Sequence, residues 1–219
     1  MLLWQEQLIS SIHKIPMYLL HKVIFTGLIF IYWELNAQVA LPTFQGVQSA
    51  GYKNTGSLAT TKVGGNGANG NVFEIKNVHS STIEIYGFKQ GATSSNSSNV
   101  MYAYYRNGNY NSGTSGWTQI LSNETVPLVA NTYSNAVDFD TAFEIPANTT
   151  YTLHIYSTSG IQYTNGIGTV NSTVTASDDF LYIYEGGGSS YQVHSSSSSI
   201  PHVQEFTPRN WNGKIRYRY

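Results

Sequence analysis

A two-residue alternation of apolar and polar side chains constrains the fold of this chain more than any other feature. In AVDFDTAFEIP, residues 136–146, every second side chain from Val137 to Ile145 points one way, and three acidic side chains point the other. The same pattern recurs in STIEIYGF, TYTLHIYS, FLYIYEG and KIRYRY. Helical periodicity is almost absent after Gln38. The chain is therefore predicted to be all-β.

Clusters of Gly, Asn and Ser separate the alternating segments, at the spacing that antiparallel sandwiches and barrels show. About ten strands are expected over residues 57–219, stacked as an antiparallel two-sheet, jelly-roll-like sandwich. Residues 38–56 are predicted to form an N-terminal leader. The run GGNGANG, residues 64–70, lacks the Lys-Ser/Thr pair of a phosphate-binding loop and is interpreted as a connection between strands.

Composition excludes several classes of function. Charged residues make up 11 % of the chain and the net charge is -1, whereas nucleic-acid binding needs concentrated positive charge. There is no cysteine, which excludes disulfides, a thiolate nucleophile and zinc–thiolate sites. No nucleic-acid partner is expected.

The N-terminus has the pattern of a secretory signal. Eleven uncharged, mostly apolar residues, VIFTGLIFIYW, follow Lys22, and this length suits a signal-peptide core better than a membrane span. Residues 1–37 are predicted to be a cleaved signal peptide, with Met1 or Met17 as the start and no membrane attachment after cleavage. An uncleaved anchor helix is the alternative. The protein is expected to be secreted or at the cell surface, and the sequence leaves a periplasmic location open.

GGNGANGNVFEIKNVHSSTIEIYGF, YAYYRNG, WTQI, YTNG, SDDFLYIYEG and PRNWNGKIRY together resemble a secreted β-sandwich module of Bacteroidetes-type bacteria. The resemblance covers roughly residues 57–219 and implies the fold and secretion. It implies no activity, because that family has no established ligand. A second, local resemblance links SDDFLYIYEGG to a strand of CUB modules, where an Asp just before the strand helps to bind calcium.

Aromatic residues are the candidates for ligand binding. In NVMYAYYRNG, Met101 and Ala103 are expected to face the core, which leaves Tyr102 and Tyr104 exposed on the opposite face, about 7 Å apart. Tyrosine rings at this spacing could stack on successive sugar units. The alternative is that they only fill a sheet face, since tyrosine favours strands. The predicted ligand-binding set adds four residues to the two tyrosines: Arg106, Trp117, Tyr163 and Trp211.

Carboxylates bracket the segment FLYIYE. Asp178, Asp179 and Glu185 could ligate calcium, which takes six to eight oxygen ligands, and a structural calcium ion is the one cofactor that the sequence suggests. The alternative is that the two aspartates only begin a strand. Asp138 and Asp140 lie two apart on one strand face, a separation that a glycoside hydrolase could use for its acid pair.

These patterns favour a secreted, non-catalytic binding module, with an extracellular glycan or a cell-surface component as its partner. Two alternatives stay open. A polysaccharide-acting glycoside hydrolase would need two carboxylates facing each other across a groove. A structural adhesion or matrix protein would need neither an aromatic cluster nor an acid pair.

Overall fold

The computed structural model describes residues 51, 54–110, 116–192 and 204–219. The predicted signal peptide, residues 1–37, and most of the leader lie outside the described residues, so both stay predictions. The described part is all-β, as the alternation predicted, and it contains no helix that could cross a membrane.

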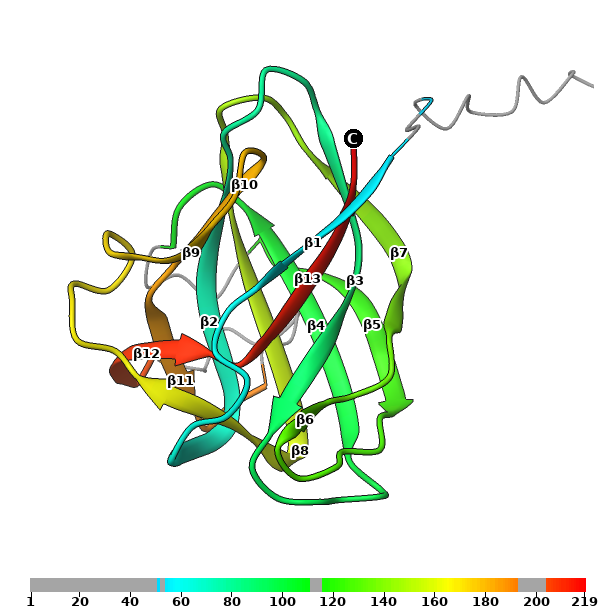
Figure 1. Ribbon diagram of the computed structural model, residues 1–219, viewed down its shortest axis with the longest axis vertical. Coiled ribbons are helices and arrows are strands. Elements are labelled where there is room, and N and C mark those ends of the chain that lie inside the picture. The colour runs from blue at the N-terminus through cyan, green and yellow to red at the C-terminus, as the bar shows by residue number, and fades with distance from the viewer. Residues whose placement is uncertain (1–50, 52–53, 111–115, 193–203) are drawn as a thin grey trace, which may run out of the picture. The chain divides into compact units, whose positions relative to one another are not determined.

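In the described residues, thirteen strands form two sheets, and every pairing between these strands is antiparallel. Figure 1 looks onto the five-stranded sheet, behind which lies the eight-stranded sheet. The five-stranded sheet comprises β1 (Thr55–Ala59), β13 (Gly213–Arg218), β3 (Ile83–Ala92), β6 (Thr132–Tyr133) and β7 (Val137–Ile145). The eight-stranded sheet comprises β5 (Thr118–Thr125), β4 (Val100–Asn107), β8 (Thr150–Asn165), β12 (Phe206–Trp211), β11 (Gly186–Ser189), β2 (Asn66–Asn77), β10 (Leu181–Tyr184) and β9 (Val174–Ser177).

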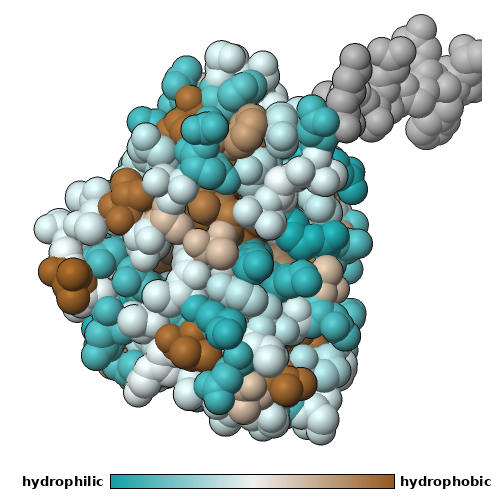
Figure 2. Space-filling view, in the orientation of Figure 1, coloured by the Kyte–Doolittle hydropathy of each residue, from teal (hydrophilic) through white to brown (hydrophobic). Residues whose placement is uncertain are grey.

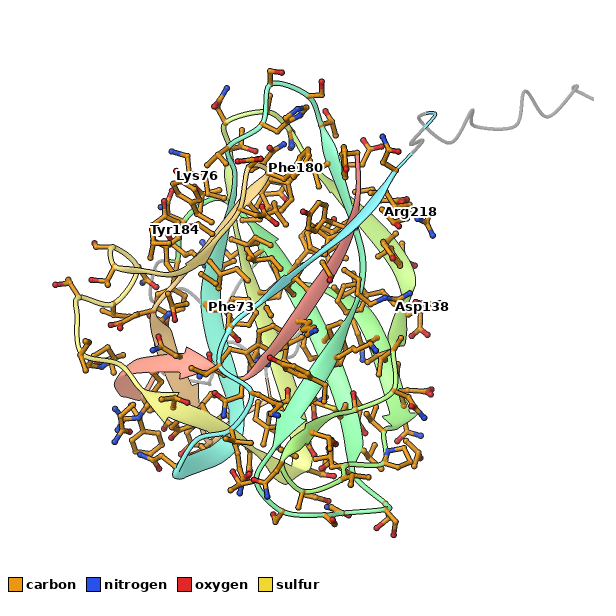
Figure 3. The ribbon with its side chains drawn as sticks, in the orientation of Figure 1. Phe73, Lys76, Asp138, Phe180, Tyr184 and Arg218 are labelled. Carbon is orange, nitrogen blue, oxygen red and sulfur yellow. The ribbon has the colours of Figure 1, made fainter. Side chains whose placement is uncertain are left out.

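The hydrophobic core lies between the two sheets and is built from the residues that the alternation assigned to it. Val137, Phe139, Phe143 and Ile145 are buried on β7, although Thr141 between them is exposed. The inward residues of β3, β8, β10 and β13 are buried in the same cluster. Figure 3 labels Phe73, which belongs to this core. The predicted all-β, two-sheet sandwich is therefore confirmed.

The eight-stranded sheet closes on itself at one end. β2 pairs with β8, β8 with β12, β12 with β11, and β11 again with β2, so these four strands form a closed circuit. Glycine makes the closure possible, because a Cβ at Gly186 would lie 1.9 Å from the Val72 carbonyl oxygen. At Gly188 it would lie 2.6 Å from the Tyr163 hydroxyl oxygen.

Two sequence boundaries need correction. The run 64–70 was expected to be a connection, but its residues from Asn66 onward belong to β2, because β8 supplies hydrogen-bond partners along this glycine-rich stretch. The first strand begins at Thr55, two residues before the predicted sandwich boundary, because it pairs with the C-terminal strand β13.

Candidate functional site

The predicted aromatic residues of β4 do converge on one face. Met101 and Ala103 enter the main core, and Tyr102 and Tyr104 lie on the outer face of the eight-stranded sheet, as expected. Trp117 joins them there in a second hydrophobic cluster. The predicted Arg106 occupies the next outward position of β4, opposite Thr152 of β8.

This outer face is covered. Tyr104 and Trp117 are buried, and burial raises the pKa of the Tyr104 hydroxyl, which accepts a hydrogen bond from the Gln192 side chain. The buried carboxylate of Glu74 fastens the chain after β4 to the sheet, because it accepts hydrogen bonds from the Tyr110 amide (2.7 Å) and the Asn109 side chain (3.1 Å). The expectation of an exposed row of rings is therefore wrong for Tyr104 and Trp117.

His154 lies at the centre of the covered face. Its ring centroid is 6.1 Å from those of Tyr104 and Trp117 and 5.8 Å from that of Tyr156. Neither ring nitrogen has a hydrogen-bond partner within the described part of the chain, and burial lowers the pKa of His154 from its ordinary value of 6.5 to about 3. The imidazole is therefore neutral at physiological pH, and it belongs to the packing of this face.

The other two predicted binding residues are internal. Trp211 is fully buried in the main core, where it stacks on Phe73 at 5.0 Å and donates a hydrogen bond to Gln90 (3.0 Å). Tyr163 is also buried, with the Arg209 guanidinium 5.6 Å from its ring centroid. Neither residue reaches the surface or the Tyr102 face, so the six predicted residues do not form one exposed site.

The structure does not bring the three carboxylates suggested as calcium ligands together at one site. Asp178 accepts hydrogen bonds from the Leu181 amide (2.8 Å) and, through its other oxygen, from the Tyr217 hydroxyl (2.7 Å). Glu185 is buried and holds the loop after β8 by accepting the amide of Gly168 (2.9 Å). Asp179 is exposed. Among the described residues, no group of three or more His, Cys, Asp or Glu side chains is placed to hold a metal ion.

The acid pair of the hydrolase alternative is also engaged elsewhere. Asp138 forms an ion pair with Arg216 on the outer face of the five-stranded sheet. Asp140 accepts a hydrogen bond from the Ser122 amide (2.9 Å) and so ties β7 to β5. Both carboxylates have structural partners and do not face each other across a groove.

A polar pocket with a volume of about 280 Å³ opens where the two sheets meet the loop after β3. Asn96 and Leu128 brace this loop, since each donates its backbone amide to the carbonyl of the other, at 3.0 and 2.8 Å. The pocket takes its walls from β2, from β8 and from the chain after β3 and after β5. Its lining residues are Gly67, Ala68, Asn69, Ala92, Ser94, Asn96, Leu128, Ser159, Gly160, Ile161 and Gln162.

Three amide side chains in this pocket each have a hydrogen-bond partner at one end only, among the residues that the structure describes. The Asn69 side chain donates to the Ser190 carbonyl (3.2 Å), the Asn96 side chain accepts from the Ser98 amide (3.1 Å), and the Gln162 side chain accepts from the Thr93 amide. An amide side chain has one acceptor oxygen and one donor NH₂ group. The Oδ1 of Asn69 and the NH₂ groups of Asn96 and Gln162 therefore stay available at fixed positions.

The described lining contains no charged and no aromatic residue. Ala92, Leu128 and Ile161 are buried and provide an apolar floor beneath the amides and the hydroxyls of Ser94 and Ser159. Such a surface suits a small, uncharged ligand that has many hydroxyl groups and an apolar face. Sequence reasoning missed these residues, because isolated Asn, Ser and Gln in turn-rich segments have no distinguishing pattern.

Comparison of the chain with models of known protein families finds no match, and neither does comparison with curated protein sequences.

Proposed function

We propose that this protein is a secreted, non-catalytic module that binds neutral carbohydrate in the polar pocket. The proposal is carried by one observation: three amides, each held at one end, offer spare donors and an acceptor above an apolar floor. A pyranose ring has this complementary chemistry, with hydroxyls at its edge and C–H groups on its face. Export is inferred from the pattern of residues 1–37.

The expected binding is weak. A neutral hydrogen bond contributes about 0.5–1.5 kcal/mol net, so three amides together with the apolar floor supply only a few kcal/mol. A total near 4 kcal/mol corresponds to a Kd of about 1 mM. The pocket volume of about 280 Å³ is at the small end for ligand sites and favours one or two sugar units.

We favour binding over hydrolysis on the chemistry of the described lining residues. The described lining contains no Asp, Glu or His that could transfer a proton to a glycosidic oxygen. An adhesion role remains compatible with the proposal when the ligand belongs to a cell or matrix surface.

The double variant Asn96→Asp, Gln162→Glu tests the proposal. Each replacement keeps the oxygen that accepts the existing backbone hydrogen bond and removes the free NH₂ donor. The purified protein is screened on an array of neutral glycans, and Kd for the strongest binder is measured by titration calorimetry. We expect the variant to bind at least tenfold more weakly than the parent.

Gln119→Glu with Asn135→Asp is the matched control, because it makes the same two chemical changes at exposed positions outside the pocket. The control should bind like the parent. A parent that binds no neutral glycan, or a pocket variant that keeps its affinity, contradicts the proposal.

A further inference from the structure

A second concave surface lies on the outer face of the five-stranded sheet. This cationic groove has a volume of about 340 Å³ and is lined by residues of β1, β3 and β13. Figure 2 shows this side of the molecule, where hydrophobic side chains appear in separate spots among polar ones. The groove contains three cationic side chains, whereas the neutral pocket contains none among its described lining. Its lining residues are Thr55, Gly56, Ser57, Tyr86, Lys89, Lys214 and Arg216.

Two lysines in this groove are placed against each other. Lys89 of β3 and Lys214 of β13 are direct cross-strand partners, so their ammonium groups extend from neighbouring positions on the same sheet face. Like charges directly opposite each other destabilise a sheet. Neither lysine has an ion-pair partner among the described residues; Lys214 lies 4.7 Å from the Tyr133 ring centroid. The fold therefore holds together two positive charges without an ion-pair partner in the described residues, at a cost in stability.

The neighbouring arginines are compensated and fixed. Arg216 pairs with Asp138, and Arg218 pairs with Glu84 at 2.8 Å. Figure 3 shows Asp138 and Arg218 along one side of the molecule. Both guanidinium groups lie over the ring of Tyr86, 4.5 and 4.4 Å from its centroid. The net positive charge of the groove is thus concentrated at the two lysines.

We propose that this groove binds an acidic polysaccharide through Lys89 and Lys214. Both lysines are direct donors to carboxylate or sulfate groups, and the hydroxyls of Ser57 and Thr55 supply further hydrogen bonds along β1. Outward side chains on one strand repeat about every 7 Å, so Lys214 and the ion-paired Arg216 lie at successive positions along β13. The surface is distinct from the neutral pocket, with which it shares no lining residue.

An acidic polysaccharide suits this surface better than a nucleic acid does. Of the cations in the described residues, only two without an ion-pair partner meet here, and the whole chain has a net charge of -1. A nucleic acid presents dense phosphate charge and is bound by wider basic surfaces. A polymer with one charge for each sugar matches two lysines and a row of hydroxyls.

The experiment compares two polymer pairs at low and high salt. Polygalacturonate and its methyl ester differ in the carboxylate charge, and dextran sulfate and dextran differ in the sulfate charge. Affinity electrophoresis should show that the parent is retarded by at least one acidic polymer, but by neither neutral partner. Salt should weaken the interaction, because exposed charges are screened. The Lys89→Gln, Lys214→Gln variant should lose at least tenfold in affinity.

Lys62→Gln with Lys76→Gln removes two positive charges at positions that do not line the groove, and it should bind within about twofold of the parent. The groove variant should melt no lower than the parent, because it relieves like-charge repulsion. A parent that binds no acidic polymer, or a groove variant with parental affinity, overturns the proposal. Tighter binding to single-stranded DNA than to either acidic polymer overturns the choice of polysaccharide.

Discussion

The outer faces of the two sheets have similar sequence patterns, but one face is covered by neighbouring chain and the other carries an open groove. On the eight-stranded sheet, Tyr104, Trp117 and His154 are buried beneath neighbouring chain and form a small second core. On the five-stranded sheet, Tyr86, Lys89 and Lys214 line an open groove. Alternation places a side chain on the outside of a sheet but does not decide whether another segment covers it. An outward position is therefore not equivalent to an exposed one.

Truncation of one ring on each face should have the largest effect, because only one of the two rings is buried. Trp117→Ala should lower the free energy of unfolding by about 3–5 kcal/mol, because it empties a buried site. Tyr86→Ala should cost only about 1–2 kcal/mol, since Tyr86 is half-buried and contributes two cation–π contacts. Urea denaturation measures both values. Equal losses would show that the two faces do not differ in cover.

Acid should destabilise the covered face through His154. Its pKa is about 3 when folded and about 6.5 when unfolded, so the unfolded state binds the proton more readily. The neutral imidazole makes its full contribution to the free energy of unfolding above pH 6.5. This contribution decreases as the pH falls toward 3. Each pH unit in this window costs about 1.4 kcal/mol, so the loss between pH 6.5 and 4.5 is about 2–3 kcal/mol.

The measurement compares urea denaturation of the parent and of His154→Leu at these two pH values. Tyr104, Tyr156 and Trp117 surround the ring, and Glu74 lies on the same sheet face. Because all four residues are present in both proteins, the difference in pH dependence between the parent and the variant reports the imidazole. The variant should have a smaller pH dependence than the parent. Identical pH dependence would mean that His154 is hydrated in the folded protein.

Much of the fold was predictable because a strand that buries one face between two sheets alternates apolar and polar side chains with a period of two. The inward residues of β3, β7, β8, β10 and β13 followed from that period alone. The strand Gly186–Ser189 was missed, because its three glycines have no side chains that could alternate between apolar and polar. Glycine is needed at Gly186 and Gly188 because the Val72 carbonyl and the Tyr163 ring lie too close for a Cβ atom.

The candidate site was much less predictable. Trp211 and Tyr163 looked like surface aromatics, but the closed circuit of β2, β8, β12 and β11 turns them inward. The amides of Asn69, Asn96 and Gln162 come from three separate segments, and only tertiary structure places them around one pocket. Local sequence does not encode that convergence.

We propose that neutral carbohydrate is recognised in the polar pocket and not by the tyrosine row of β4. This proposal is tested most directly by titrating ¹⁵N-labelled protein with the strongest neutral binder from the glycan array and following the backbone amide resonances. We expect the largest shifts at residues 67–69, 94, 96 and 159–162, which line the pocket. Largest shifts at Tyr102 and Tyr104, with the pocket amides unchanged, would contradict it.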